Sequence, residues 1–148
     1  RDCLLSRGLG DVYKRQRDMD FIRDLLLEIE DGRSSFSTLS KATAIVLGID
    51  PNDAISEEES KKLEYHLDLL REAGFAEFIA LSGGIWQVDR VTWKGHEFLD
   101  NIRDPEVWRQ TKVGASKAGG FSLKVIASVA EAIIKSRIEK LMLGNLDA

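Results

Sequence analysis

The fold is decided by residues 66–75, which read HLDLLREAGF. His66, Leu67 and Leu70 share one face at helical spacing, because residues three and four apart point the same way on an α-helix. Gly74 is a typical helix end, since glycine adopts the left-handed backbone conformation without steric cost. The chain then continues at once into a run that alternates between apolar and polar residues. The stretch therefore predicts an amphipathic helix that leads directly into a β-strand.

The residues on both sides extend this prediction. Ser56 and Glu59 have the spacing of a capping box, so the helix is expected to start there. Residues 82–84, Ser-Gly-Gly, lie between two apolar runs and predict the turn of a β-hairpin. The predicted elements are helices over 17–31, 38–47 and 56–73, a loop over 34–37, strands over 75–81 and 85–91, and a helix over 93–103.

The C-terminal part has its own start and stop signals. Asp104 followed by Pro105 predicts the N-cap and first residue of a short helix. The small residues within 111–120 predict a linker. Ser122 then caps a long helix with a wide apolar stripe, which is expected to end at Gly144. The predicted organisation is a domain over 17–110, a linker over 111–120, and a C-terminal helix within 121–148 that packs on the body or on a second copy.

Residues 1–16 are expected not to belong to the natural protein. The hexapeptide DVYKRQ at 11–16 back-translates to GAT GTG TAT AAG AGA CAG, which resembles a transposase end sequence used to prepare sequencing libraries. We therefore expect a disordered, adapter-derived tail. This tail holds Cys3, so residues 17–148 offer no disulfide, no thiol nucleophile and no cysteine ligand for zinc.

The order of three helices followed by a hairpin resembles that of winged helix-turn-helix proteins, which are mostly α-helical with one β-hairpin. In that fold the third helix ends at a glycine and leads into the first strand of the wing. Further motifs are RDMD at 17–20, YHL at 65–67, AGF at 73–75, and GHEFLD at 95–100 with the residues through Trp108. On these motifs the chain more narrowly resembles the bacterial and prophage family called domain of unknown function 2513. This resemblance implies a winged-helix fold and a mobile-element context, and it implies no particular activity.

The charge distribution bears on whether such a fold binds DNA. The chain carries 21 Lys and Arg against 25 Asp and Glu, a net charge of −4. Residues 17–108 carry 10 basic and 20 acidic side chains, a net charge of −10, whereas residues 109–148 carry 7 and 3, a net charge of +4. DNA binding depends on neutralising phosphates with Lys and Arg. An acidic third helix opposes entry into the major groove.

Neither catalysis nor metal binding is predicted by any residue pattern. His66 shares a face with leucines and His96 begins a helix, so both are interpreted as packing or capping residues. The glycine pairs at 83–84 and 119–120 lack the spacing of phosphate-binding loops. An exposed tryptophan would indicate a protein contact. Three tryptophans are instead expected to pack beneath the hairpin: Trp86, Trp93 and Trp108.

We therefore expect a cytoplasmic, non-enzymatic protein-interaction module that forms a homodimer through its last helix. No catalytic residue, metal, cofactor, small-molecule substrate or membrane partner is expected, and no apolar run reaches the ~18 residues that cross a bilayer. The expected partner-binding residues are Glu57, Glu58, Glu64, Asp68, Arg71, Ile126, Ile133, Ile134 and Leu141. The alternative is a DNA-binding regulator that uses Lys61, Lys62, Tyr65, Arg71, Arg90, Arg109, Lys112, Lys117 and Lys124.

Overall fold

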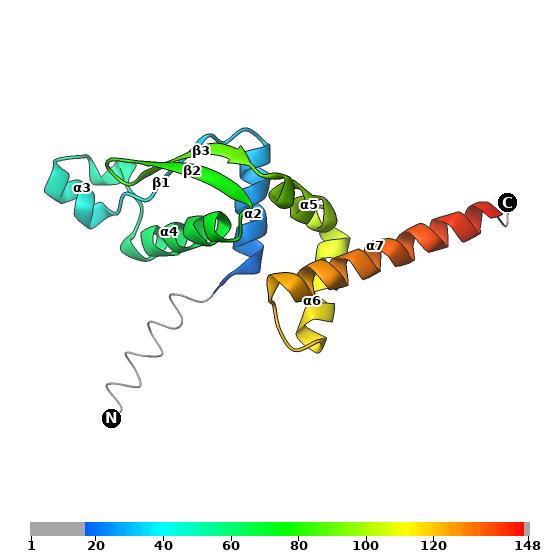
Figure 1. Ribbon diagram of the computed structural model, residues 1–148. Helices are drawn as coiled ribbons and strands as arrows, with labels where there is room; N and C mark the ends of the chain where they lie inside the picture. The colour runs from blue at the N-terminus through cyan, green and yellow to red at the C-terminus, as the bar shows by residue number, and fades with distance from the viewer. Residues whose placement is uncertain (1–16, 147–148) are drawn as a thin grey trace, which may run out of the picture. The chain divides into compact units, whose positions relative to one another are not determined.

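A computed structural model describes residues 17–146, and their side chains through Gly144 (Figure 1). The prediction for residues 1–16 lies outside the described residues. The described chain forms six α-helices, one 3-10 helix and three strands, so the mostly helical fold class is confirmed. It divides into two compact units between Gly95 and His96, which is earlier than the expected boundary at residue 110.

The N-terminal unit, residues 17–95, begins with helix α2 at Met19–Glu30. The carboxylate of Asp18 caps this helix by accepting a hydrogen bond from the Phe21 N–H. The buried side chains recur every three or four residues and form the inner face of the helix. They are Met19, Ile22, Leu25, Leu26 and Ile29.

A three-stranded antiparallel sheet in the order β1-β3-β2 follows (Figure 1). Strands β2 at Ala76–Leu81 and β3 at Ile85–Val91 are the predicted hairpin, which is confirmed. Strand β1 at Ser35–Ser37 lies where a loop was expected, and that prediction was wrong. Phe36 is 1% exposed and pairs with Trp86 of β3. The three residues Ser-Phe-Ser are too short an alternation to predict a strand from sequence, and the strand forms by pairing with β3.

Two helices lie between β1 and β2. Helix α3 spans Lys41–Leu47, and helix α4 spans Glu57–Glu72, with the 3-10 helix η1 at Pro51–Asp53 between them. Both halves of the predicted capping box are present at the start of α4. Helices α2 and α4 pack on each other and on the sheet (Figure 1). Gly74 follows α4 with a φ of 74°, as its role as a helix end requires.

Helix α5, Trp93–Ile102, starts in the N-terminal unit and continues into the C-terminal one. Thr92 begins it as predicted, because its hydroxyl accepts a hydrogen bond from the Gly95 N–H. A Cβ on Gly95 would lie 2.1 Å from the carbonyl oxygen of Phe75. Only glycine, which has no Cβ, therefore allows the start of α5 to lie this close to Phe75.

The C-terminal unit, from His96 onward, contains helices α6 at Pro105–Lys117 and α7 at Leu123–Leu146. The predicted linker over 111–120 was wrong, because α6 continues through most of it. Thr111 and Ala115 are fully buried, and a Cβ on Gly114 would lie 2.7 Å from Val129 of α7. The small residues thus allow two helices to approach closely. Gly144 also does not end α7, which continues to Leu146.

Candidate functional site

The surface that best fits a functional role lies beside the second half of α7. Ile126 and Ala130 of this helix are fully buried where α6 covers it. From Lys135 to Gly144 every residue is exposed, including Ile138 at 51% and Leu141 at 69%. The apolar stripe therefore continues past the part of α7 that α6 covers.

The antiparallel packing of α6 and α7 explains where this cover ends. Near the C-terminal end of α6, Gly114 lies against Val129. At its N-terminal end, Asp104 lies 3.5 Å from Arg137, measured from the carboxylate Oδ1 to Nη1. Residues of α7 beyond Arg137 extend past the start of α6, and Figure 1 shows the red end of the helix continuing alone within its unit.

A groove of about 570 Å³ lies at this point. Its lining combines apolar residues with polar residues and charges of both signs. The apolar residues are Val107, Ile134, Ile138 and Leu141, and the polar or charged residues are Asp100, Asn101, Asp104, Arg137 and Lys140. We call this surface the α7 groove.

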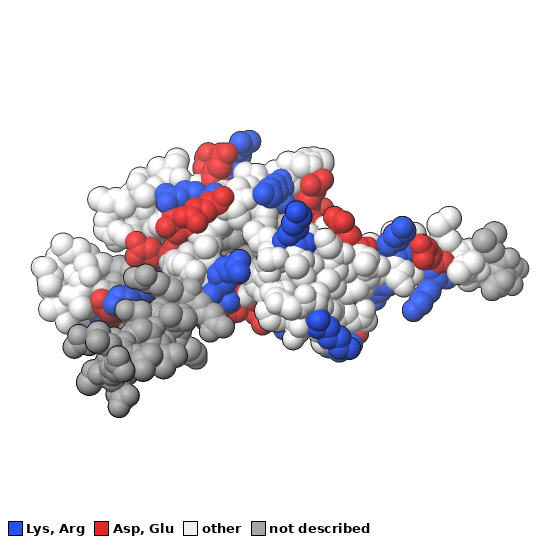
Figure 2. Space-filling model, turned by 60° about the horizontal axis from the view of Figure 1, so that its bottom comes forward, with Lys and Arg blue, Asp and Glu red and all other residues white. Residues whose placement is uncertain are grey.

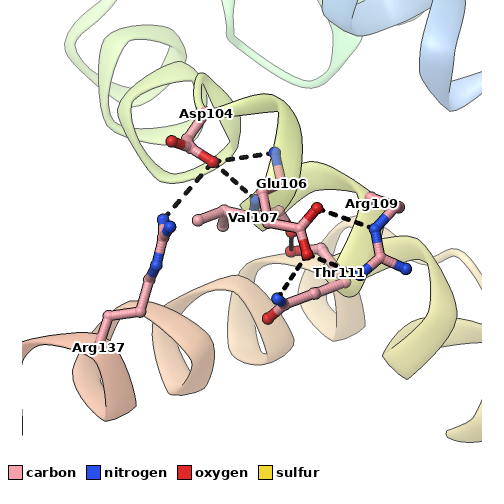
Figure 3. A network of polar contacts seen from close by, with 7 residues as sticks. Asp104, Glu106, Val107, Arg109, Thr111 and Arg137 are labelled. Atoms are coloured by element: carbon pink, nitrogen blue, oxygen red, sulfur yellow. Dashed lines mark hydrogen bonds and ion pairs between the residues drawn. The ribbon is translucent and has the colours of Figure 1, made fainter. Parts of the chain in front are cut away.

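Hydrogen bonds anchored on Asp104 hold the wall of the α7 groove (Figure 3). One carboxylate oxygen of Asp104 accepts from the backbone N–H groups of Glu106 and Val107, each at 2.9 Å. The bond from Val107 is the main cause that lowers the pKa of Asp104, and the Arg137 guanidinium adds to it. The predicted N-cap is thereby confirmed, and the same side chain links α6 to α7.

A second set of contacts lies on the solvent side of the same helix turn (Figure 3). Arg109 donates two hydrogen bonds to the carboxylate of Glu106, and Gln110 donates a third. These donors lower the pKa of Glu106 to about 2, with the Arg109 bonds contributing most. The hydroxyl of Thr111 donates to the Val107 carbonyl at 2.6 Å, so the buried side is also satisfied.

The chemistry available to the α7 groove is burial of apolar side chains. In the described part of the chain, no group of three or more His, Cys, Asp or Glu residues could hold a metal ion. No buried side-chain nitrogen or oxygen among residues 17–144 lacks a hydrogen-bond partner. The α7 groove thus presents apolar surface beside charged side chains, which is typical of a protein contact.

The expected partner-binding residues fall into two sets. On α7, Leu141 is exposed and Ile133 and Ile134 are half-buried, but Ile126 is fully buried. The prediction for Ile126 is corrected, because α6 covers it. On α4, Glu57, Glu58 and Glu64 are exposed, and Asp68 forms an ion pair with Arg71.

Most of the basic residues of the alternative set are paired with acids or stacked on aromatic rings. Lys62 lies 3.1 Å from Asp18, and Arg90 is bidentate with Glu77 at 2.8 and 3.0 Å. Tyr65 is half-buried with its ring edge against His66. Arg71 and Arg109 pair with Asp68 and Glu106, Lys112 lies over the ring of Trp108, and Lys61, Lys117 and Lys124 are exposed. On the face shown in Figure 2, blue and red side chains mostly lie beside one another.

Histidines and tryptophans separate cleanly into buried and exposed. His66 is fully buried with both ring nitrogens hydrogen-bonded, so its packing role is confirmed, whereas His96 is exposed. Trp86 and Trp108 are buried at 9% and 4% exposure. Trp93 is 79% exposed, so the prediction that it packs beneath the hairpin was wrong.

Sequence reasoning missed the exposed apolar side chains of α3. Ile45 and Val46 are 65% and 83% exposed. The signal was available: apolar residues run consecutively from Ala44 to Leu47, and consecutive residues cannot all face the same side of a helix.

The described residues form a mostly helical protein with a small antiparallel sheet. The chain belongs to the family described as "Hypothetical protein (DUF2513)", which matches residues 16–122. It is also similar to an "Uncharacterized protein" of Haemophilus influenzae, with 34% identity over 127 residues that cover 83% of this chain and 98% of that protein. No solved structure matches this chain. Within the described residues, no helix has the length and apolar character needed to cross a membrane.

Proposed function

We propose that this protein is a non-enzymatic winged-helix protein-interaction module, located in the cytoplasm, that forms a homodimer through the α7 groove. The observation that carries the proposal is the continuity of the stripe on α7. Ile126 and Ala130 are covered by α6, and the same stripe continues to Ile138 and Leu141 in the open. A second copy would cover the open part as α6 covers the rest.

A two-fold arrangement suits this surface. In a symmetric dimer each copy offers the same patch, so the groove of one copy takes Ile138 and Leu141 of the other. The lining offers charges of both signs, with Asp100 from α5 and Lys140 from α7. In an antiparallel pairing of the two α7 helices, Lys140 of one copy can face Asp100 of the other, which favours one register over slipped ones.

The order of elements supports the winged-helix part of the proposal. The N-terminal unit runs α2, β1, α3, α4, β2, β3, and its sheet has β3 in the centre. This is three helices followed by a hairpin, with one short strand added to the edge of the hairpin. We further propose a mobile-element context, and the family membership leaves the activity open.

The oligomeric state of the full chain tests the dimer. Sedimentation equilibrium on Leu141→Glu should give a dimer dissociation constant raised at least about tenfold over the unsubstituted chain. Leu143→Glu is the matched control, because Leu143 is also exposed on α7, at 61%, but does not line the α7 groove. A monomeric unsubstituted chain at high micromolar concentration, or an equal effect of both substitutions, would refute the proposal.

A DNA-binding regulator is the second candidate, and the winged-helix order of elements is the observation that favours it. The acidic residues of α4 and the paired state of Arg71, Arg90 and Arg109 oppose it. Fluorescence anisotropy of labelled mixed-sequence duplex DNA with the full chain, titrated across salt, distinguishes the two. We expect no binding at low salt. Binding that weakens steeply as salt rises would support the DNA candidate instead.

A further inference from the structure

Helix α3 and the residue after its C-cap present four large apolar side chains to solvent within five residues. Ile45, Val46, Leu47 and Ile49 are 65%, 83%, 55% and 40% exposed, and we call them the α3 patch. The buried residue of the helix is Ala44. Contiguous apolar side chains with this exposure are uncommon on a protein surface unless something covers them.

The fold of the N-terminal unit does not need these side chains. Ser40 caps α3, and Gly48 ends it with a φ of 71°. Backbone hydrogen bonds then hold the segment, from Ile49 N–H to the Ala44 carbonyl at 2.8 Å and from Lys41 N–H to the Ile55 carbonyl at 2.9 Å. The helix is therefore positioned by its caps, its backbone and Ala44, which leaves the apolar side chains of the α3 patch available for binding.

Acidic residues follow the α3 patch in the sequence. Residues 34–60 contain Lys41 as the basic side chain, against five acids at positions 50, 53, 57, 58 and 59. Asp53, Glu57 and Glu58 form no ion pair with another residue of the described chain. Asp50 directly follows Ile49, and η1, which contains Asp53, packs on α3, so negative charge lies next to the α3 patch. Three of the five carboxylates form no ion pair in the described chain.

We propose that the α3 patch docks a protein segment that is both apolar and basic, such as an amphipathic helix with Lys or Arg on either side of its apolar face. Its apolar side chains would cover Ile45, Val46 and Leu47. Its cations would meet Glu57 and Glu58, which are among the partner-binding residues expected from the sequence. The same carboxylates repel DNA phosphates and anionic lipid headgroups, so charge complementarity selects a basic protein segment.

This docking surface is independent of the dimer, since α3 and α7 belong to different units. The test uses the full chain and two synthetic helical peptides, each about four turns long. Both peptides carry leucines in the same amphipathic pattern, and the polar positions are Lys in one and Glu in the other. Binding is followed by the anisotropy of a label on the peptide, and the surface is mapped by amide chemical shifts.

We expect the Lys peptide to bind and to shift the amides around residues 45–58, and the Glu peptide not to bind. Val46→Ser should weaken binding at least about tenfold, and Glu57→Gln with Glu58→Gln should weaken it several-fold and flatten its salt dependence. Leu143→Ser is the matched control, because it removes an apolar side chain of α7 that is also largely exposed, at 61%, and it should leave binding unchanged. Since Val46 is 83% exposed, its substitution is not expected to change the melting temperature.

Three results would overturn the proposal. Absence of binding by the Lys peptide would show that the α3 patch takes no such segment. Equal binding to the Val46→Ser protein, or equal binding of the Glu peptide, would show non-specific attraction. Loss of the dimer in Val46→Ser, with Leu141→Glu unaffected, would show that a second copy covers the α3 patch instead.

Discussion

The backbone N–H of Asp18 donates a 2.9 Å hydrogen bond to Nε2 of His66, a residue 48 positions away. Since Nε2 accepts, the ring proton is on Nδ1, which donates to the Lys62 carbonyl at 2.7 Å. The neutral ring thus joins the start of α2 to the middle of α4. Burial is the main cause that lowers the pKa of His66 below its ordinary 6.5.

This contact predicts a loss of stability in mildly acidic solution. The unfolded chain protonates His66 near pH 6.5, whereas the folded chain does so at a lower pH. The stabilisation is fully present above pH 6.5 and is lost as pH falls through the folded pKa, with a slope of at most about 1.4 kcal/mol per pH unit for one proton. Urea denaturation from pH 7 to pH 5 measures it.

His66→Gln provides the control for that measurement, because an amide can accept and donate but does not titrate in this range. The carboxyls with lowered pKa values, such as Asp18, titrate below their ordinary 3.8 to 4.5 and do not act in this window. We expect a flatter pH dependence in the variant. The same slope in both proteins would mean that His66 is not the group responsible.

Substitution of Gly95 should destabilise the protein although it lies in a helix. An alanine inside a helix normally stabilises by about 1 kcal/mol relative to glycine. At Gly95 the new Cβ would lie 2.1 Å from the Phe75 carbonyl oxygen, so the backbone must move, at a cost of about 1–3 kcal/mol or more. Gly144→Ala is the control, since nothing lies within 4 Å of its Cβ position, and it should be neutral or stabilising in the same thermal melt.

Removal of the Phe36 ring tests the contribution of strand β1 to stability. The ring is 1% exposed beneath the Arg33 guanidinium, and its backbone pairs with Trp86. Phe36→Ala should lower the free energy of unfolding by about 3–5 kcal/mol, as large truncations in a core do. Ser37→Ala, at the exposed next position of the strand, should change it little. A small effect of Phe36→Ala in denaturant titration would contradict the placement of β1 in the core.

The two roles of Asp104 can be separated by substitution. Asp104→Ala removes both the cap of α6 and the ion pair with Arg137, whereas Asp104→Ser retains an N-cap acceptor. Arg137→Gln removes the charge pairing alone. We expect the melting temperature to fall most for Asp104→Ala and least for Arg137→Gln, because exposed ion pairs contribute little. A larger fall for Arg137→Gln would show that the link to α7 outweighs the cap.

The amino-acid sequence by itself determined the elements whose signals are local. Two helix starts depend on caps that hydrogen-bond to backbone groups a few residues away: Ser56 with Glu59, and Asp104 followed by Pro105. Gly74 ends its helix through its own backbone conformation. These roles therefore follow from the adjacent chain. The apolar stripe of α7 could also be predicted, because its helical period depends on residue identity alone.

The tertiary structure decided the features that depend on a distant partner. Strand β1 exists because β3 lies beside it, and α6 continues through its small residues because α7 approaches there. Ile126 and Leu141 belong to one stripe, yet one is fully buried and the other is 69% exposed. The period of the stripe is the same at both residues. Where α6 begins and ends along α7 decides which turns are covered and which remain open to a second molecule.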